Sequence, residues 1–206
     1  MKPRNTDNPR YQEQKLAAVR AAASVFSEKG FHGACTRDIA ERLGIKQGSL
    51  YYYFDSKEEA LEEVCLYGLE SYVDNMEAIA GADEPFAARL LAVVTNHLSR
   101  YRERSEALKV HNDERLYLPA ERRVRLKQLG SRYREQLETI FIDGVASGAV
   151  RNDIDCHFVA QSVISICNGF GDIIVRDADA DVFDFARKCT DLLLHGTSPQ
   201  PASGDE

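Results

Sequence analysis

Apolar residues recur at intervals of three and four along almost the whole chain, with polar residues between them. This spacing is the period of an α-helix, and no stretch shows the sustained alternation of period two that marks a half-buried strand. The pattern therefore predicts an all-α fold. The helices expected from it span residues 11–29, 36–43, about 47–54, 56–80, 86–104, 108–118, 120–147, 155–176 and 181–195.

Residues with known preferences for helix ends support these boundaries. Gly30 and Gly44 stand where the first and second helices should stop, because glycine adopts the left-handed conformation that is common just after a helix. Thr36 is expected to cap the N-terminus of the second helix, and Asp55 or Ser56 that of the fourth.

The composition is that of a folded, soluble protein, with 44% hydrophobic and 29% charged residues. The uncharged run at 156–171 is 16 residues long and contains several polar side chains, so we expect it to be too short and too polar to span a bilayer. Residues 1–10 lack the apolar region of a secretion signal, which favours a cytosolic location. The same residues, and 197–206, are expected to form a disordered arm and tail.

Five cysteines are widely spaced, with no C-x-x-C motif and no histidine at a zinc-finger spacing. In a reducing compartment we interpret them as small buried apolar residues. No metal and no cofactor are predicted.

Charge is distributed unevenly along the chain. Residues 1–55 contain nine Lys and Arg against six Asp and Glu, a net charge of +3, whereas the remaining 151 residues carry −10. This asymmetry is typical of a protein in which only the N-terminal part meets a polyanion.

The stretch Thr36 to Asp55 reads TRDIAERLGIKQGSLYYYFD and predicts two short helices joined by a tight turn. Ala40 is small where the helices must cross, and Gly44 can make the turn. This is the spacing of a helix-turn-helix, whose second helix lies in the DNA major groove. An ordinary helical hairpin with a tyrosine-rich surface remains the alternative.

Residues 11–61, and TRDIAERLGIKQGSLYYYFDSKEEAL in particular, resemble the DNA-binding domain of the tetracycline-repressor-type (TetR) family of bacterial transcription regulators. The resemblance implies a dimeric repressor with a three-helix DNA-binding domain at 11–55. It also implies a helical domain at 56–196 that binds a small inducer and dimerises. The partners expected are therefore double-stranded operator DNA, an inducer and a second copy of the chain.

The resemblance also implies which residues contact DNA. Thr36 and Arg37 would hold phosphate at a helix N-terminus, and Gln47 could read adenine. Tyrosine at position 53 departs from the family pattern, in which a histidine is usual, and Tyr51 could instead be partly buried against the first helix. The full predicted set is Thr36, Arg37, Lys46, Gln47, Gly48, Ser49, Tyr51, Tyr52, Tyr53 and Lys57.

Two DNA-binding domains are needed for tight binding, because one such domain buries only about 600–1,000 Å² on DNA. The helices at 155–176 and 181–195 are apolar on more than one face, and Ser162, Ser165, Gly169 and Gly171 would permit a close approach. We expect these helices to form a four-helix interface across a dimer. The alternative is that they are buried wholly within one subunit.

A sensing cavity should be apolar with a few well-placed polar groups. Five polar residues in apolar surroundings are the candidate ligand-binding set, although each alone could be a satisfied core residue. They are His97, Tyr101, Tyr133, Asn168 and Asp172.

Residues 115–134 carry seven basic side chains against one acid, Glu121, inside an otherwise acidic domain. Such a run can be a solvated helix face, but it also suits an anionic inducer. The segment VHNDERLYLPAERRVRLKQL, with the turn at 142–150, resembles acyl-CoA-responsive TetR regulators of lipid or steroid breakdown.

Two other classes of protein remain as alternatives: a helical enzyme and a helical protein-interaction module without DNA binding. His111, Asp113 and Glu114 lack the ligand set of a helical di-metal site, and no HExxH, GxSxG, P-loop or GxGxxG motif is present. We therefore predict no catalytic activity. Salt dependence would distinguish DNA binding from apolar protein binding.

Overall fold

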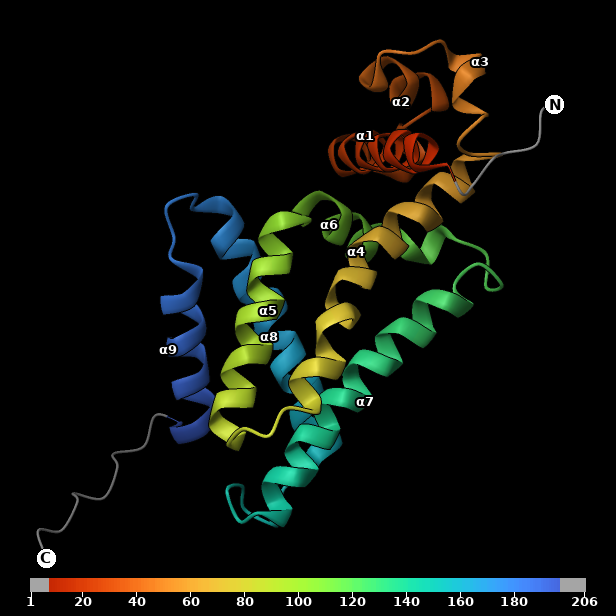
Figure 1. The fold of residues 1–206 in the computed structure, drawn as a ribbon. Coiled ribbons are helices and arrows are strands. Elements are labelled where there is room, and N and C mark those ends of the chain that lie inside the picture. The colour runs from red at the N-terminus through yellow and green to blue at the C-terminus, as the bar shows by residue number, and fades with distance from the viewer. Residues whose placement is uncertain (1–7, 197–206) are drawn as a thin grey trace, which may run out of the picture. The chain divides into compact units, whose positions relative to one another are not determined.

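The computed structural model describes residues 8–196, and every regular element within that range is a helix, as predicted (Figure 1). The chain forms two compact units. Unit 1 contains the described residues up to Ser71 together with Arg104–Gly130, and unit 2 contains Tyr72–Glu103 together with the described residues from Ser131 onward. The predicted arm and tail at 1–10 and 197–206 lie wholly or largely outside the described residues.

Unit 1 is built around the N-terminal helices and shares two long helices with unit 2. Its elements are α1 (Pro9–Gly33), α2 (Thr36–Leu43), α3 (Gln47–Leu50), the start of α4 (Lys57–Ala80), α6 (Ser105–Glu114), the 3-10 helix η1 (Arg115–Tyr117) and the start of α7 (Val124–Ala146). Helix α1 packs against both α2 and α6. Phe26, Ile39, Leu50 and Leu61 are at most 2% exposed, so a single apolar core joins α1 to α4.

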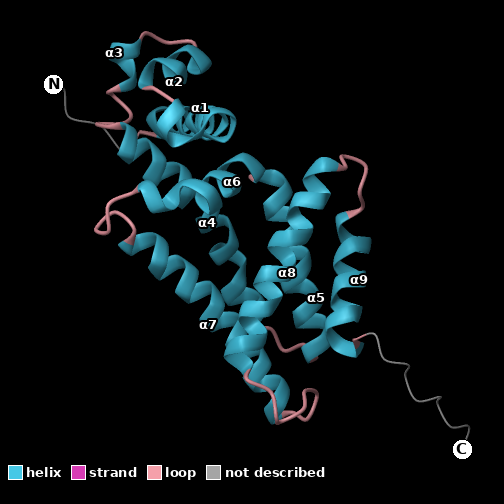
Figure 2. Ribbon diagram, turned by 180° about the vertical axis from the view of Figure 1, so that it is seen from behind, coloured by secondary structure: helices cyan, strands magenta, loops and turns pink. Residues whose placement is uncertain are grey.

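Unit 2 is a helical bundle. It contains the end of α4, α5 (Phe86–Glu103), the rest of α7, α8 (Cys156–Arg176) and α9 (Val182–His195). Helix α5 packs against both α8 and α9 (Figure 2). Leu90, Val94 and Leu98 recur along α5 at intervals of four and are buried, because these positions share one face of a helix.

The two glycines predicted to stop helices adopt the left-handed backbone. Gly44 has φ 73° and ends α2, and the next N–H, from Ile45, bonds the Ala40 carbonyl at 3.0 Å. Gly30 has φ 69° and ψ 166°, which interrupts the helical backbone, and a short helical segment follows the kink as far as Gly33. Gly30 therefore ends the first regular stretch of helix as predicted, within the bounds given for α1.

The helix starts differ in detail from the predictions. Cys35, not Thr36, is the N-cap of α2, and its N–H donates to Asp38 Oδ2 at 2.8 Å. Asp38 is the third residue of α2, and its carboxylate thus accepts the N–H of the N-cap residue, as in a capping box. Ser56 caps α4 as expected, accepting the Glu59 N–H at 3.0 Å.

Two expected helices are shorter than predicted. Helix α3 ends at Leu50, and residues 51–53 follow as turns, with Tyr53 N–H bonded to the carbonyl three residues back at 2.8 Å. Helix α7 begins at Val124 rather than 120, after a run of turns. Local turn geometry with i→i+3 bonds replaces regular α-helix at both places.

Helix α8 corrects one expectation about length. The uncharged run stops at Gly171, but the helix continues through Asp172 to Arg176, and by length and composition it could cross a membrane. A central helix of a soluble bundle passes the same test. Only 28% of its most apolar stretch is buried in the described chain, so much of this apolar surface is left to be covered.

Candidate functional site

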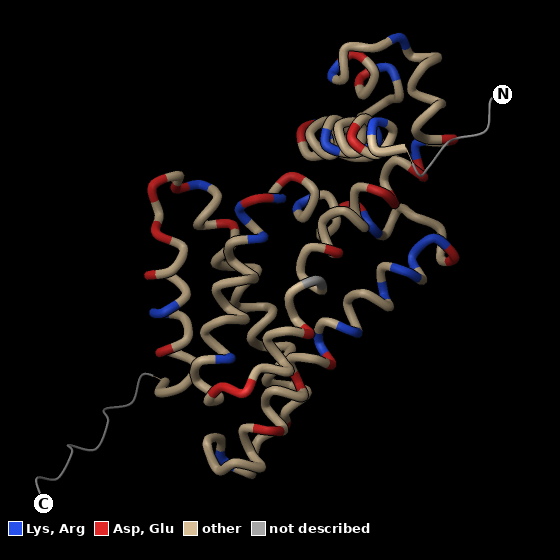
Figure 3. The backbone as a smooth tube through the Cα atoms, in the orientation of Figure 1, with Lys and Arg blue, Asp and Glu red and all other residues tan. Residues whose placement is uncertain are grey.

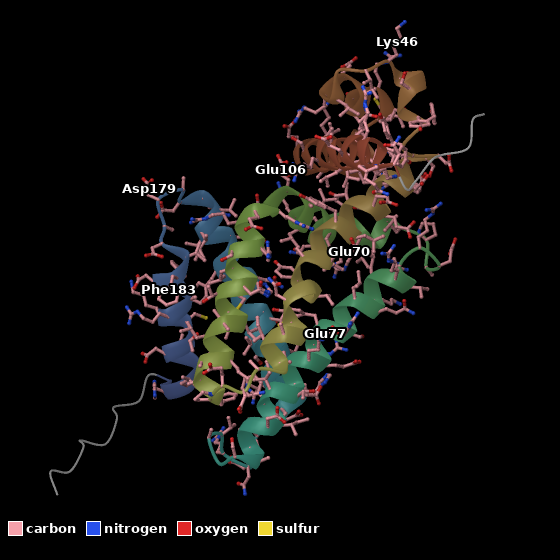
Figure 4. The ribbon with its side chains drawn as sticks, in the orientation of Figure 1. Lys46, Glu70, Glu77, Glu106, Asp179 and Phe183 are labelled. Carbon is pink, nitrogen blue, oxygen red and sulfur yellow. The ribbon has the colours of Figure 1, made fainter. Side chains whose placement is uncertain are left out.

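The exposed face of α2 and α3 carries most of the residues predicted to contact DNA. Arg37, Lys46, Gln47 and Ser49 are all exposed, whereas Leu50 on the opposite side of α3 is 2% exposed. The N-terminal head is the three-helix part made by α1, α2 and α3. Figure 4 shows Lys46 projecting from this head into solvent. The sequence folds this way because the apolar positions of two short helices share one face.

The cations of this face differ from the other basic residues nearby. Lys29 is paired with Asp38 at 2.7 Å, and Arg42 with Glu28 at 2.6 Å. The hydrogen bond from Lys29 lowers the pKa of the Asp38 carboxyl, with further help from Cys35. Arg37 and Lys46 have no ion-pair partner within residues 8–196, so their charges are available to an external anion.

Two more predicted contact residues connect α2 to α3. Gln47 Nε2 donates to Thr36 Oγ1 at 3.0 Å, which leaves its second amide hydrogen and its carbonyl oxygen for another partner. A Cβ added at Gly48 would meet no atom within 4 Å, so the backbone there faces open space. A duplex could approach closely at this position.

The three tyrosines have different environments. Tyr51 and Tyr52 are 43% and 39% exposed, and Tyr52 lies edge-on to Tyr11 with ring centroids 5.3 Å apart. Tyr53 is less exposed: it stacks on Tyr11 at 6.2 Å and donates to Gln14 Oε1 at 3.4 Å. Partial burial against the first helix, the alternative considered for Tyr51, is found at Tyr53.

Lys57 points inward rather than away from the head. Its Nζ donates to the carbonyl oxygens of Phe31 and Ala34 at 2.8 and 3.0 Å and lies 4.3 Å from the centre of the Phe31 ring. Two of its three hydrogens are therefore used to close the kinked end of α1. Any phosphate contact would depend on the third.

The predicted ligand residues of unit 2 do come together. His97 is 2% exposed; its Nδ1 lies 3.0 Å from the Tyr133 hydroxyl and its Nε2 lies 3.1 Å from Asn168 Oδ1. An amide oxygen only accepts, so Nε2 carries the hydrogen and the Tyr133 hydroxyl donates to Nδ1. Burial lowers the pKa of His97 to about 4, against a smaller opposing effect of Asn168. The imidazole is therefore neutral at pH 7.

Tyr72 completes this buried group. Its ring stacks on His97 with centroids 4.4 Å apart, and burial raises the pKa of its hydroxyl. The hydroxyl has no hydrogen-bond partner among the described residues. A buried donor without a partner costs stability, so it is a place where a ligand acceptor would be favourable. The sequence pattern places Tyr72 only on the apolar stripe of α4, which hides this role.

Tyr101 and Asp172 form a second, more open pair, with the hydroxyl donating to Oδ1 at 2.6 Å. Asp172 is exposed, which corrects the expectation that its surroundings are apolar. Gly171 is also corrected: a Cβ there would lie 2.5 Å from the Tyr101 ring, so this glycine admits Tyr101 and does not face a second subunit.

Unit 2 also contains a cavity of about 360 Å³ that the sequence did not reveal. Its lining is apolar except for one cation and is made by Phe86, Leu90, Phe141, Ala149, Val150, Arg151, Ile154, Val159, Leu193 and Leu194. Gly144 is the sequence signal that could have indicated it, because a Cβ there would lie 2.7 Å from Val150 and 2.8 Å from Phe86. The close approach of these chain segments shapes the cavity wall.

Helices α8 and α9 expose large apolar side chains. Phe158 is 66% exposed, Phe183 56% and Leu192 43%. Figure 4 shows Phe183 projecting from α9 away from α5. Exposed positions on α8 recur at 158, 161, 165, 169 and 172, the spacing of a single helix face. Among these five positions only Phe158 is a large apolar residue, so the exposed apolar surface described here comes from Phe158 of α8 and from Phe183 and Leu192 of α9. Exposed apolar side chains that lie close together mark an interaction face.

Comparisons with known proteins agree with this architecture. Residues 18–64 match the family model "Bacterial regulatory proteins, tetR family", and residues 83–172 match "Tetracyclin repressor-like, C-terminal domain". The chain is similar to the HTH-type transcriptional repressor KstR2 of Rhodococcus jostii, with 34% identity over 135 residues that cover 65% of this chain and 66% of that protein.

Other relatives match over nearly the whole chain. The fatty acid metabolism regulator protein of Bacillus subtilis is 22% identical over 91% of this chain and 95% of its own. Among solved structures, the TetR family regulator PfmR of Thermus thermophilus superposes with a TM-score of 0.82 and 27% identity, over 88% of this chain and 99% of its own. These findings bear out the family indicated by the helix-turn-helix: the chain belongs to the TetR family of DNA-binding transcriptional regulators.

Proposed function

We propose that this regulator is a dimeric repressor that is released from a palindromic operator by a lipid-like anionic ligand such as an acyl-CoA. It would act in the cytoplasm, where its operator lies, and without a catalytic step. The observation that carries the choice of ligand is the apolar cavity of unit 2 with its single cation. The names of relatives point the same way, since one solved structure, 22% identical, is the Bacillus subtilis FadR in complex with stearoyl-CoA.

The contacts proposed for DNA follow from the head described above. Lys46, Gln47, Gly48 and Ser49 would approach base edges, because they are exposed at the start of α3. Phosphates would be held by the residues around them, which fix register without reading sequence. Those residues are Thr36, Arg37, Tyr51, Tyr52, Tyr53 and, through its remaining hydrogen, Lys57.

The dimer is proposed to form through α8 and α9. Their exposed aromatic and aliphatic side chains would be covered by the same helices of a second copy, which makes a four-helix interface with twofold symmetry. Gly169 supports a close approach, because no atom lies within 4 Å of a Cβ placed there.

The ligand is proposed to lie along α5. Leu90 in the cavity and His97 in the buried polar group are seven residues apart, which is two turns and about 10 Å on one helix face. An acyl chain would fill the apolar cavity with the anionic group of the ligand beside Arg151, and the polar wall farther along α5 would be formed by His97, Tyr101, Tyr133, Asn168 and Asp172. A volume of about 360 Å³ lies within the range of ligand sites.

Thermal unfolding with acyl-CoAs of several chain lengths, and with the free acids, tests this ligand. Binding should raise the midpoint in proportion to the logarithm of ligand concentration. Val159→Trp should abolish the rise by filling the cavity, whereas Ile142→Trp, at a residue 51% exposed on α7 and outside the cavity lining, should not. If neither acyl-CoAs nor acids shift the midpoint of the parent protein, the proposed ligand class is wrong.

Release from DNA is the second part of the same test. Anisotropy of a labelled operator duplex should fall when the stabilising acyl-CoA is added to the parent protein, but not when it is added to Val159→Trp. A ligand that stabilises the protein without lowering DNA affinity would contradict its role as an inducer.

A further inference from the structure

The basic run at 115–134 divides into paired and unpaired cations. Within unit 1, Arg122 pairs with Glu62 at 2.5 Å and Arg125 with Glu70 at 2.6 Å, and both carboxylates come from α4. Figure 3 shows Lys and Arg recurring along the segment before α7 and through its first turns. Glu62 and Glu70 of α4 therefore neutralise one side of this basic segment.

Arg115, Arg123 and Lys127 are the cations that face elsewhere. They line a cavity of about 140 Å³ together with His111, Leu116 and Leu126, and no carboxylate is among its lining residues. None of the three has an ion-pair partner within residues 8–196. Three cations thus line one small space, and an anion bound there would reduce their mutual repulsion.

Two buried nitrogens next to this space lack hydrogen-bond partners among the described residues. They are His111 Nδ1 and Arg123 Nε. Arg115 is held in place, because its Nη1 donates to the carbonyl oxygens of His111 and Asn112 at 3.1 and 2.5 Å. Arg123 Nε is a donor, and His111 Nδ1 is one in the tautomer that carries the hydrogen there. Buried donors are normally satisfied, so an unsatisfied one beside a cationic cavity indicates a missing acceptor. The site thus offers donors, positive charge and no competing acid.

We propose that this cavity binds a phosphate-type oxyanion, either as the free ion or as a phosphate ester on a larger effector. Arg123 and Lys127 would supply the charge, and Arg123 Nε a directed hydrogen bond. The space suits one phosphate group with a few waters, since each water occupies about 30 Å³. The inference goes beyond the proposed function, because the cavity belongs to unit 1 and takes an anion whatever ligand unit 2 binds.

The position of the cavity gives the anion a route to the DNA-binding head. Helix α6, which carries His111, packs against α1. Its last residue is Glu114, whose Oε2 accepts a hydrogen bond from the Phe31 N–H at 3.0 Å. A Cβ at Gly30 would lie 3.3 Å from the same carboxylate. An anion that fixes the end of α6 would therefore bear directly on the kinked end of α1.

Titration calorimetry of the full-length protein with inorganic phosphate, at constant ionic strength, tests the site. The parent should bind one phosphate per chain at about millimolar concentration or tighter. Arg123→Gln and Lys127→Gln should each weaken binding about ten-fold, the value of one charged hydrogen bond. Arg125→Gln removes the same charge from the start of α7, two residues after Arg123 and two before Lys127 but outside the cavity, so it should change affinity less than about two-fold.

Adenosine 3′,5′-bisphosphate distinguishes the sources of the anion. If it binds more tightly than phosphate and loses affinity in the same two variants, the natural effector carries a phosphate ester; if phosphate binds at least as well, the free ion is the ligand. Circular dichroism of the variants confirms that they fold. The proposal is overturned if neither compound binds the parent, or if Arg125→Gln weakens binding as much as Arg123→Gln, which would indicate a general attraction to positive charge. Neither result would affect the free-acid arm of the thermal test, because free fatty acids carry no phosphate and report on the cavity of unit 2.

Discussion

The N-terminal head and unit 2 place polar and apolar residues in opposite ways. The head hides its apolar residues, with Ile39 and Leu50 at most 2% exposed, and presents Arg37, Lys46 and Gln47 to solvent. Unit 2 buries a hydrogen-bonded polar group around His97 and leaves Phe158 exposed. A long polar polymer can be read only from outside, whereas a small molecule can be enclosed. The difference therefore separates the DNA-binding part from the part proposed to bind the ligand and to dimerise.

The exposed apolar face of unit 2 gives the largest expected effect. Phe183→Asp puts a charge in the proposed interface, so the protein should be a monomer by sedimentation at micromolar concentration. Its operator affinity should fall at least about 1,000-fold, towards non-specific binding. Ile142→Asp makes the same chemical change at a residue of similar exposure on α7 and should leave both properties unchanged. A dimeric Phe183→Asp would show that α9 is not the interface.

The buried polar group of unit 2 should make stability depend on pH. Unfolded His97 takes up a proton below its ordinary pKa of 6.5, but the folded residue resists protonation down to about 4. His97 therefore does not change the free energy of unfolding above pH 6.5. As the pH falls from 6.5 towards 4, protonation of the unfolded state lowers that free energy by about 3 kcal/mol at most. Partly buried His111, whose pKa is likewise lowered to about 4 by burial and then by Arg115, adds a loss in the same range of pH.

Denaturant unfolding of His97→Gln between pH 4 and 7 isolates this contribution. The variant should lose less stability over that range than the parent, whatever its absolute stability. His32→Gln, which replaces an exposed histidine, is the control and should follow the parent. An unchanged pH dependence in His97→Gln would mean that the imidazole is not sealed from water.

The exposed polar face of the head should determine sequence preference. Gln47→Ala should cost about 1–3 kcal/mol of operator affinity and relax the preference at one base pair in each half-site, because a lost base contact leaves the phosphate contacts intact. Gln128→Ala, an exposed glutamine on α7, should have no effect. Equal losses on operator and random DNA would instead make Gln47 a phosphate contact.

Substitution of Arg37 should give the smallest change in DNA affinity, together with a change in its salt dependence. Arg37→Gln should weaken binding to all sequences alike and reduce the slope of log affinity against log salt by about one per head. Arg42→Gln removes a cation already paired with Glu28 and should leave the slope unchanged. A slope unaffected by Arg37→Gln would mean that no phosphate lies at the start of α2.

Sequence periodicity and turn residues predicted the helices well, because each of those signals is local. The all-α fold and the family are confirmed, and Gly44 and Ser56 act as predicted. The helix-turn-helix was readable because its apolar spacing and turn glycine lie within twenty residues. The short α3 was not, since Tyr51 to Tyr53 suit a helix as well as the turns they form.

Features that depend on distant residues were harder to predict. The grouping of His97 with Tyr133 and Asn168 was anticipated only as a set of polar residues on apolar stripes, without its partners or geometry. The cavity near Arg151 and the inward turn of Lys57 could not be foreseen, because both depend on how separate helices pack. Asp172 and Gly171 were misplaced for the same reason.

Selection of bound duplexes from a random DNA pool by the full-length protein tests the central claim most directly. Two outward-facing heads joined by α8 and α9 should enrich an inverted repeat, with half-site centres about 10–10.5 base pairs, or a multiple of that, apart. Arg37→Gln should recover the same repeat with lower yield. Enrichment of no sequence, or of a single half-site without its symmetry mate, would contradict the account.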